Sequence, residues 1–316
     1  MSISGRPQAP AMTNPRADRV REVARLAGRP ARLKRGQFLA EGPQSVREAL
    51  RLHALRGASG GQEVVTELFA TGAALERNPD IAALADGPGL PTARLVTDEV
   101  LAEMSSTVTP QGLIAVCRFI DVSLESVLAA RPKLLAVLVE VRDPGNAGTI
   151  LRAADSAGAD AVILTASSVD LYNPKAVRST AGSLFHLPVV LGADRDELLA
   201  ALREHYLTVL AADGYGDVDL DALQDESSAR RLTGSGTAGT AGGAAGDRAR
   251  LEEPTAWLFG NEAQGLPADL VEAAGHRVAV PIYGQAESLN VGTAATVCLY
   301  ASARAQRRTP ANSSPA

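Results

Sequence analysis

The chain has 316 residues, of which 46% are hydrophobic and only 3% aromatic, with a formal net charge of −5 at pH 7. This length and apolar content allow a sizeable core, which we expect to be divided between two domains. The acidic balance excludes a protein coated in positive charge. No apolar run reaches about 20 residues and the N-terminus lacks an apolar signal core, so we expect a cytoplasmic protein that does not enter a membrane.

Positive charge is concentrated near the N-terminus. Residues 1–57 contain twelve Lys and Arg against four Asp and Glu, a balance of +8, so the remainder carries −13. A basic segment on an acidic body suggests contact with a phosphate backbone, because Lys and Arg that neutralise phosphates release counterions. An Arg-rich helix with a solvated face accounts for the same charge equally well. Charge alone leaves both interpretations open.

The cysteines and histidines do not have the spacing of a metal site. Cys117 and Cys298 stand far apart in apolar contexts, which is typical of reduced core thiols in a cytosolic protein. The four histidines are scattered, and no pair has the spacing of one helix face. We therefore expect neither a disulfide nor a metal site.

The first third of the chain alternates between helix and strand. Its start, 1–15, is rich in Pro and is predicted to be a disordered arm. Helices are predicted at 14–27 and 97–106, strands at 64–71, 93–97 and 112–119, and a strand, Gly-Pro turn and amphipathic helix over 36–52. This pattern predicts a compact α/β domain over 16–118, followed by a linker over 119–133.

A second alternating series begins at Leu134. Strands are predicted at 134–140, 161–165, 188–191, 208–212, 255–260 and 276–282, and helices at 147–158, 173–185, 194–205, 265–274 and 288–306. Strands bounded by helices in this way form a mainly parallel sheet covered on both faces. The series predicts a second domain over 134–306. A Gly/Ala-rich flexible insertion interrupts it at 233–250, and a disordered tail follows at 307–316.

Three polar segments at predicted strand ends are the candidates for chemistry. No GxGxxG follows a strand and no GxxxxGK[ST] occurs, which disfavours nicotinamide or nucleoside triphosphate binding through such loops. The polar segments are 142–152, 259–267 and 280–295. In an open parallel sheet, ligands bind outside the carboxyl ends of the strands, so the three segments can converge on one crevice. Turn glycines, a helix-start carboxylate and helix caps would explain each segment separately.

Taken in this order and spacing, the three segments resemble the motifs of the SpoU branch of the SPOUT RNA methyltransferases, the TrmH family. The first motif corresponds to 146–154, the second to 259–266, and the third to 280–282 with 288–291. The resemblance covers about 134–304. The first domain also resembles the ribosomal-protein-like substrate-binding domain often fused to these enzymes, chiefly at 38–50. The Gly-rich insertion and Gly292, where the family often has Ser, are departures.

The resemblance implies a fold, a cofactor and an assembly. The fold would be a parallel-sheet α/β trefoil knot of the SPOUT class, preceded by a small α/β ribosomal-protein-like RNA-binding domain. The cofactor would be S-adenosylmethionine in a bent shape, and the protein would be a homodimer whose active site is completed at the interface. Cofactor contacts would come from main-chain groups near Leu210, Gly260, Val280, Ile282, Leu289 and Asn290.

The resemblance also assigns catalytic roles. Arg152 matches the proposed catalytic arginine of the family, which the usual proposal makes the proton acceptor. Since the pKa of an arginine exceeds about 12, we favour a role in binding phosphate and stabilising a developing alkoxide. Asn146 would orient Arg152 or the ribose, Glu262 would anchor Asn146 and the knot loops, and Ser288 with Asn290 would shape the crevice.

The predicted function is methylation of a ribose 2′-hydroxyl in RNA. Large-subunit ribosomal RNA is favoured, because the first domain resembles a ribosomal-protein fold, and transfer RNA is the runner-up. The same family includes resistance methyltransferases, which modify ribosomal RNA to block an antibiotic, and this alternative remains open. A non-catalytic knotted RNA-binding protein would lack the Arg or Asn of the first motif, and both are present. A dehydrogenase is disfavoured by the missing glycine fingerprint.

Overall fold

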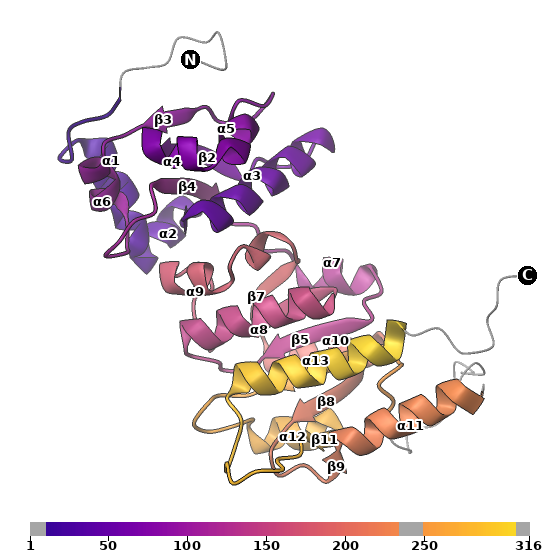
Figure 1. Ribbon diagram of the computed structural model, residues 1–316. Coiled ribbons are helices and arrows are strands. Elements are labelled where there is room, and N and C mark those ends of the chain that lie inside the picture. Colours follow the sequence, from indigo (N-terminus) through magenta and orange to yellow (C-terminus); the bar gives the residue numbers. More distant parts are fainter. Residues whose placement is uncertain (1–10, 234–248, 308–316) are drawn as a thin grey trace, which may run out of the picture. The chain divides into compact units, whose positions relative to one another are not determined.

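A computed structural model describes residues 11–233 and 249–307 (Figure 1). The chain forms two compact units, one made of Met1–Ile120 with Asp170–His186 and the other of Asp121–Val169 with Leu187–Ala316. Residues 1–10 of the predicted arm, and nearly all of the predicted insertion and tail, lie outside the described residues. Met12, also within the predicted disordered arm, pairs with Val96, and its N–H donates to the Leu95 carbonyl oxygen at 2.8 Å. No helix in the described ranges is long and apolar enough to cross a membrane.

The first unit is built on a four-stranded mixed sheet with the order β1-β4-β2-β3. Its strands are β1 (Gln37–Glu41), β2 (Val65–Ala70), β3 (Ala93–Leu95) and β4 (Leu113–Arg118). The strand β4 runs antiparallel to both neighbours, and β2 and β3 are parallel. All four strands fall where the apolar runs predict them.

Helices pack on the sheet of the first unit. They are α1 (Asp18–Ala24) with a 3-10 turn (Arg25–Ala27), α2 (Arg29–Arg35), α3 (Pro43–Ala58), α4 (Gly72–Arg77), α5 (Pro79–Ala85) and α6 (Asp98–Met104). The Thr97 hydroxyl accepts from the Val100 N–H and caps α6, which lies within the helix predicted at 97–106. The short α2, α4 and α5 were not predicted, because six or seven residues span less than two full turns and carry little periodicity.

Residues 170–186, within the range predicted for the second domain, belong to the first unit. Tyr172 packs against Phe38 and Phe119, with ring centroids 4.5 and 4.3 Å apart, and its hydroxyl accepts a 2.8 Å hydrogen bond from the Ile120 N–H. This segment contains α9 (Pro174–Ser179) and a 3-10 turn (Ser183–Phe185) instead of one helix over 173–185. The break falls at Gly182, whose φ of 96° leaves the helical region.

Within the described residues, the second unit forms a seven-stranded sheet with the order β7-β6-β5-β10-β8-β11-β9. The strands are β5 (Leu134–Leu138), β6 (Ala161–Thr165), β7 (Val189–Ala193), β8 (Thr208–Ala212), β9 (Val218–Asp219), β10 (Thr255–Phe259) and β11 (His276–Ala279). Every pairing is parallel. The predicted parallel α/β sheet is thereby confirmed.

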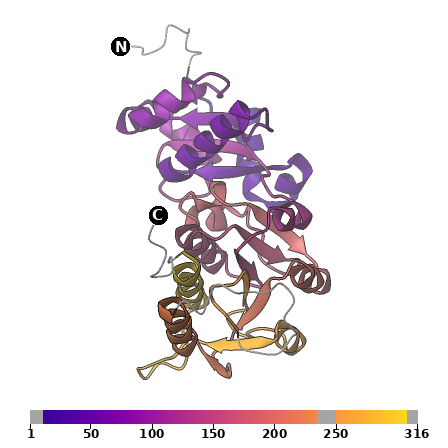
Figure 2. The same cartoon turned by 90° about the vertical axis from the view of Figure 1, so that its right-hand side faces the viewer.

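Helices cover both faces of this sheet (Figure 2). One layer contains α8 (Pro144–Ala157), α11 (Leu220–Thr233) and α13 (Val291–Arg307), and the other contains α7 (Leu124–Ala129), α10 (Arg195–Glu204) and α12 (Ala268–Ala274). Helix α7 lies in the stretch predicted as a linker, where Val127 and Leu128 join the core. Helix α11 was not predicted.

Both cysteines are free and buried in the structure, as their apolar contexts predict. Burial raises the pKa of the Cys117 and Cys298 thiols, because a thiolate is poorly solvated in an apolar interior. These thiols therefore stay protonated and inert at neutral pH.

Candidate active site

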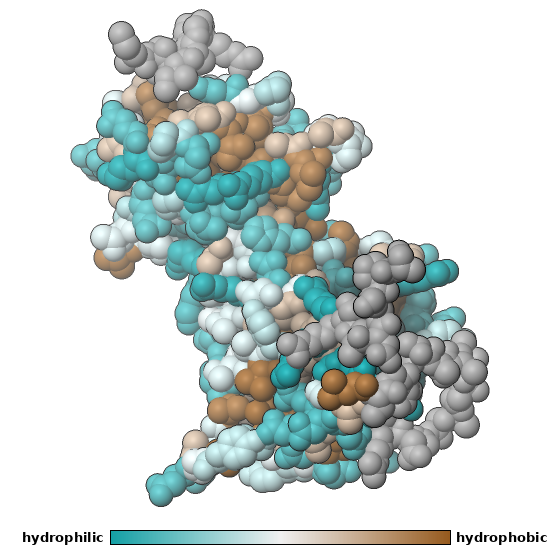
Figure 3. Space-filling model, turned by 45° about the vertical axis from the view of Figure 1, so that its right-hand side comes forward, coloured by the Kyte–Doolittle hydropathy of each residue, from teal (hydrophilic) through white to brown (hydrophobic). Residues whose placement is uncertain are grey.

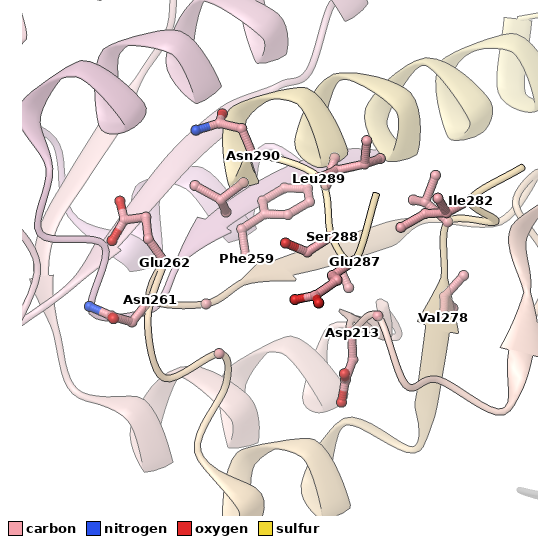
Figure 4. Close-up of a pocket in the computed structure, with 17 residues that line it drawn as sticks. Asp213, Phe259, Asn261, Glu262, Val278, Ile282, Glu287, Ser288, Leu289 and Asn290 are labelled. Carbon is pink, nitrogen blue, oxygen red and sulfur yellow. The ribbon is translucent and has the colours of Figure 1, made fainter. Parts of the chain in front are cut away.

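A cavity of about 370 Å³ lies at the carboxyl ends of β8, β10 and β11, beside the segment that leads into α13 (Figure 4). These three strands are neighbours in the sheet, so their ends bring distant parts of the sequence together. The lining residues are Ala212, Asp213, Gly214, Phe259, Gly260, Asn261, Glu262, Gly265, Val278, Val280, Ile282, Glu287, Ser288, Leu289, Asn290, Val291 and Ala294.

The first motif forms the turn from β5 into α8. The Asp143 carboxylate accepts from the Asn146 N–H at 2.8 Å and caps the helix, and Pro144 occupies the first turn, where its missing N–H has no partner to lose. A Cβ on Gly145 would stand 2.8 Å from the Asp143 carboxylate, so glycine leaves room for the cap. This turn chemistry fixes the position of Asn146 at the start of α8.

Side chains of all three motifs are joined by hydrogen bonds at the edge of the cavity. The Asn146 amide nitrogen donates to Glu262 Oε1 at 2.9 Å, and the Asn290 amide nitrogen donates to Asn146 Oδ1 at 3.0 Å. Asn290 also caps α13, since its Oδ1 accepts from the Gly292 N–H at 2.9 Å. Asn290 is therefore both a helix cap and a link between motifs, and positions 116 and 144 residues from Asn146 meet in one cluster.

The second motif is a tight turn that allows the backbone to fold back on itself. Asn261 and Gly265 exchange backbone hydrogen bonds of 3.0 and 2.8 Å. A Cβ on Gly260 would lie 2.4 Å from the Gly265 carbonyl carbon, so only glycine fits there. The Asn261 amide donates to the Glu140 carbonyl oxygen at 2.9 Å and ties this turn to the end of β5.

The side-chain charge around the cavity is entirely negative. Among the described residues, Asp213, Glu262 and Glu287 line it, and no Lys, Arg or His does. Asp213 pairs with Arg277 at 2.9 Å, and Glu262 accepts from Asn146. In the described part of the chain the Glu287 carboxylate has no hydrogen-bond or ion-pair partner, and it points into the cavity together with the Ser288 hydroxyl (Figure 4). The cavity is thus suited to a cationic ligand.

Most of the residues predicted for the site lie around this cavity. The lining includes Glu262, Ser288 and Asn290 from the predicted catalytic set, and Gly260, Val280, Ile282 and Leu289 from the predicted cofactor set. Leu210 does not line it: its side chain is fully buried within β8, and Ala212 at the end of that strand contributes instead.

Arg152 lies outside the lining, on α8, two turns beyond Asn146. Its side chain is exposed, and within the described residues its guanidinium makes no hydrogen bond or ion pair. A free cation at this position is available to bind an anion that approaches from solvent.

Sequence reasoning missed Asp213 and Glu287. Asp213 follows a predicted strand and begins an Asp-Gly turn, which is a visible strand-end signal. Glu287 directly precedes Ser288 in the third motif, and only the path of the backbone shows that it faces the cavity.

A parallel α/β sheet with a ligand cavity at its carboxyl edge and a polar cluster beside it defines an α/β enzyme. Comparison with known proteins identifies the family. The SpoU rRNA Methylase family model matches residues 133–300, and the MRM3-like substrate binding domain matches residues 17–115. The chain belongs to the SpoU rRNA methylase family, which confirms the resemblance drawn from the three motifs.

Two curated relatives match long stretches of the chain. RlmP of Bacillus subtilis, a 23S rRNA (guanosine(2553)-2'-O)-methyltransferase, is 36% identical over 209 residues, which is 65% of this chain and 70% of the relative. An uncharacterized tRNA/rRNA methyltransferase of Synechocystis sp. is 31% identical over 296 residues, 93% of this chain and 92% of the relative.

Solved structures share the fold over nearly the whole chain. An RNA 2'-O ribose methyltransferase superposes with a TM-score of 0.71 at 30% identity, covering 94% of this chain and 99% of that one. The SpoU methyltransferase AviRb from Streptomyces viridochromogenes, solved with AdoMet, has a TM-score of 0.67 at 26% identity and covers 92% of this chain and 98% of its own.

Proposed function

We propose that this protein transfers the methyl group of S-adenosylmethionine to a ribose 2′-hydroxyl of RNA, with 23S ribosomal RNA as the substrate. The family membership supports the reaction, and the activity of the Bacillus subtilis relative supports the substrate. The observation that carries the proposal is the Asn146–Glu262–Asn290 hydrogen-bonded cluster, which unites the three motifs beside the cavity.

The cavity fits S-adenosylmethionine in charge and in polarity. The donor carries a sulfonium and an ammonium cation, and the charged side chains that line the described cavity are the three carboxylates of Asp213, Glu262 and Glu287, of which Asp213 also pairs with Arg277 outside the lining. Apolar contacts for the adenosine portion are available from Val278, Val280, Ile282 and Leu289. When bound, the donor supplies an activated methyl group on a sulfonium leaving group. Glu287 would hold one of its cations, because this carboxylate faces the cavity with no protein partner in the described residues.

The side chains around the cavity would orient the RNA and handle the hydroxyl proton. Arg152 would bind the phosphate next to the target ribose and stabilise the oxygen as it loses its proton. Asn146 is held by hydrogen bonds on both its nitrogen and its oxygen, so its role would be to orient Arg152 or the ribose. Glu262 would anchor Asn146, and Ser288 would line the path of the ribose. Precise positioning supplies much of the rate in such a transfer.

We propose that a second copy of the chain completes the site. Among the exposed apolar side chains of the second unit, Val297 (38%) and Tyr300 (49%) lie together on one helix. Apolar patches also break its hydrophilic surface in Figure 3. Val297 and Tyr300 lie on α13, which packs against the helix that carries Arg152, and the Tyr300 hydroxyl donates to the Ser156 carbonyl oxygen. A partner on this surface would cover the apolar groups and enclose Arg152.

The remaining features of the proposal concern domain roles and topology. The family matches at 17–115 and 133–300 support an RNA-binding domain over 16–118 and a methyltransferase domain over 134–306. We infer a trefoil knot, because the late strand β10 inserts between β5 and β8 and the segment after it returns to the cavity. We also infer a cytoplasmic location, since a 23S ribosomal RNA substrate is found there.

The test is incubation of deproteinised 23S ribosomal RNA, and separately of transfer RNA, with methyl-labelled donor and the full chain. Label is expected in 23S RNA, in dinucleotides that resist alkali because a 2′-O-methyl group protects the adjoining phosphodiester. Label in transfer RNA alone would replace the ribosomal substrate, and absence of label from both would refute the activity. Light scattering of the same sample tests the dimer, which Tyr300→Glu is expected to dissociate.

A further inference from the structure

A second cavity, of about 250 Å³, lies within the first unit. It is enclosed by the turn between β1 and α3, by the loop between α6 and β4, and by α9. Polar side chains from all three elements line it: Glu41, Thr107, Thr109, Gln111 and Arg178. Neither the three motifs nor the proposed methyl transfer uses any of them.

Glu41 is the fixed centre of this cavity. Its side chain is only 5% exposed, and its carboxylate accepts from the Ser105 hydroxyl at 2.6 Å, the Ser106 hydroxyl at 2.5 Å and the Ser106 N–H at 3.2 Å. Arg178 Nη1 lies 3.4 Å from the same carboxylate and donates to the Ser106 hydroxyl at 2.6 Å. These bonds immobilise the loop and one side of the guanidinium before any ligand arrives.

Two hydrogen-bonding groups beside Glu41 have unused capacity. The hydrogen bonds that Arg178 makes to described residues use Nη1 alone, which leaves the N–H groups of Nε and Nη2, and its side chain is 34% exposed. Gln111 is exposed and its amide makes no hydrogen bond to any described residue. The Gln111 amide stands over Gly42, where a Cβ would lie 2.6 Å from its oxygen. Gly42, with a φ of 86°, therefore leaves the amide its place at the rim.

The chemistry of the lining selects among ligand classes. The Glu41 carboxylate would repel a free phosphate, and the Arg178 guanidinium would repel a metal ion. A neutral planar group avoids both repulsions. If it carries donors and acceptors along one edge, it can bond to Gln, which offers a donor and an acceptor, and to Arg, which offers a planar fork of donors. Pro110, Leu113 and Ile114 provide an apolar wall for the face of such a group.

We propose that this cavity binds an unpaired nucleobase of the RNA substrate, with Gln111 and Arg178 reading its edge and Glu41 acting as a positioning residue. Proteins recognise RNA sequence mainly through unstacked bases that are hydrogen-bonded along their edges. Arg and Gln are the side chains that form paired hydrogen bonds with purine edges. Val108, fully exposed at the tip of the same loop, is placed to contact a neighbouring base. The inference rests on the proposed function, because it assumes an RNA substrate.

The test measures binding of the full chain to short single-stranded RNA homopolymers and to an RNA duplex of equal length, by fluorescence anisotropy. The wild-type protein is expected to prefer one single-stranded sequence to the duplex. Gln111→Ala should weaken that preferred strand about tenfold and leave duplex binding unchanged. The matched control is Gln62→Ala, an exposed glutamine of the same unit, which should bind as the wild type does. Both substitutions are at exposed side chains, and thermal unfolding verifies that the variants fold.

Arg178→Ala distinguishes base reading from phosphate binding, with Arg77→Ala as the control of equal charge on the exposed α4. If Arg178→Ala loses affinity only for the preferred single strand, the result supports the proposal. Equal loss for every sequence and the duplex, with a shallower salt dependence, would identify a phosphate contact and overturn it. If the Gln111→Ala variant bound RNA as the wild type does, the proposal would also be overturned, and Glu41 would serve only to hold the loop in place.

Methyl transfer to 23S ribosomal RNA by the wild-type protein is followed in parallel. If transfer occurs but Gln111→Ala retains the wild-type KM and strand preference, only the nucleobase pocket is refuted. If no RNA is methylated while the preference for one strand still depends on Gln111, the proposed activity fails and the pocket stands.

Discussion

The cavity beside the three motifs and the Glu41 cavity are built in the same way and carry opposite kinds of unused hydrogen-bonding capacity. Each lies beside a turn from a strand into a helix that begins with proline, β1 into α3 and β5 into α8. In the first unit the carboxylate of Glu41 is fully engaged, and hydrogen-bond donors are left over. In the second unit the donors of Asn146 and Asn290 are engaged, and the carboxylate of Glu287 is left over.

The contrast shows that polar groups without a partner in the described chain indicate the ligand of a cavity better than the types of residue that line it. Both cavities contain a glutamate and amide side chains. Free donors suit a neutral base edge, and a free carboxylate suits a cationic methyl donor. Substitutions at five positions can break or sharpen the contrast, and we describe them from the largest expected effect to the smallest.

Arg152→Ala should reduce methyl transfer by at least about 100-fold, because it removes the one cation proposed to stabilise the oxygen that loses its proton. Donor binding should not change, since Arg152 does not line the cavity. Single-turnover transfer measures the first quantity and calorimetry the second. Arg142→Ala, an exposed arginine just before α8, is the control. Undiminished transfer would remove Arg152 from the mechanism.

Asn146→Ala and Glu262→Ala should each reduce transfer about 10- to 100-fold, because each removes one partner of the hydrogen bond that joins the motifs. The double variant should be little worse than either single one, since the two side chains act through the same hydrogen bond. The measurement is kcat for the three variants. Multiplicative losses would show that the two residues act independently.

Glu287→Gln should weaken binding of S-adenosylmethionine three- to fivefold, as expected for one exposed ion pair. The product S-adenosylhomocysteine keeps the ammonium group but lacks the sulfonium charge. The effect of Glu287→Gln on product affinity therefore shows which of the two cations Glu287 binds. Unchanged product affinity would assign Glu287 to the sulfonium, and an equal loss would assign it to the ammonium. Calorimetry with Glu272→Gln, an exposed acid on α12, provides the control. Unchanged affinity for both ligands would exclude a role in cofactor binding.

Gly292→Ala should destabilise the second unit by about 1–2 kcal/mol through overpacking. A Cβ there would stand 2.8 Å from Cγ2 of Thr149, whose hydroxyl is held by the Gly145 carbonyl oxygen. Thr149→Ser removes that methyl group and should restore much of the loss. Urea unfolding can be followed through Trp257, the single tryptophan, which is buried in β10.

Gly284→Ala is the control for this last comparison, because no atom lies within 4 Å of the added Cβ. Its stability should stay within about 0.5 kcal/mol of the wild type. If Gly292→Ala were equally neutral, close packing of α13 against α8 would not explain the glycine at this position.

Long strands and capped helices were predictable because their signals are local. The apolar runs of β5, β6 and β10 are buried along their whole length. Asp143 caps α8, which follows β5, and Thr97 caps α6, which follows β3. The short helices α4, α5 and α7 were not recognised, since their six or seven residues owe their stability to packing on the core.

The site was predictable where motifs repeat a known order and unpredictable where a single residue turns toward the cavity. The three segments could be assigned to one crevice because parallel strands end at the same edge of a sheet. Main-chain groups near Leu210 were predicted to bind the cofactor; the Leu210 side chain is buried, and Ala212, two residues further along β8, lines the cavity. Asp213 carried a strand-end signal that was overlooked, whereas Glu287 could be assigned to the cavity only after the chain was folded.

The sequence by itself determined the parallel α/β plan, the family and the three polar segments. Hydrophobic periodicity, helix caps and motifs each depend on residues that are close together in the sequence, so they can be recognised without the fold. Only the tertiary structure decided that residues 170–186 pack with the first unit, that Glu287 is left without a partner in the described chain, and that Gln111 and Arg178 share a cavity. Such relations depend on which side chains satisfy one another across long sequence separations. Hydrogen-bond partners and burial are properties of the packed chain as a whole.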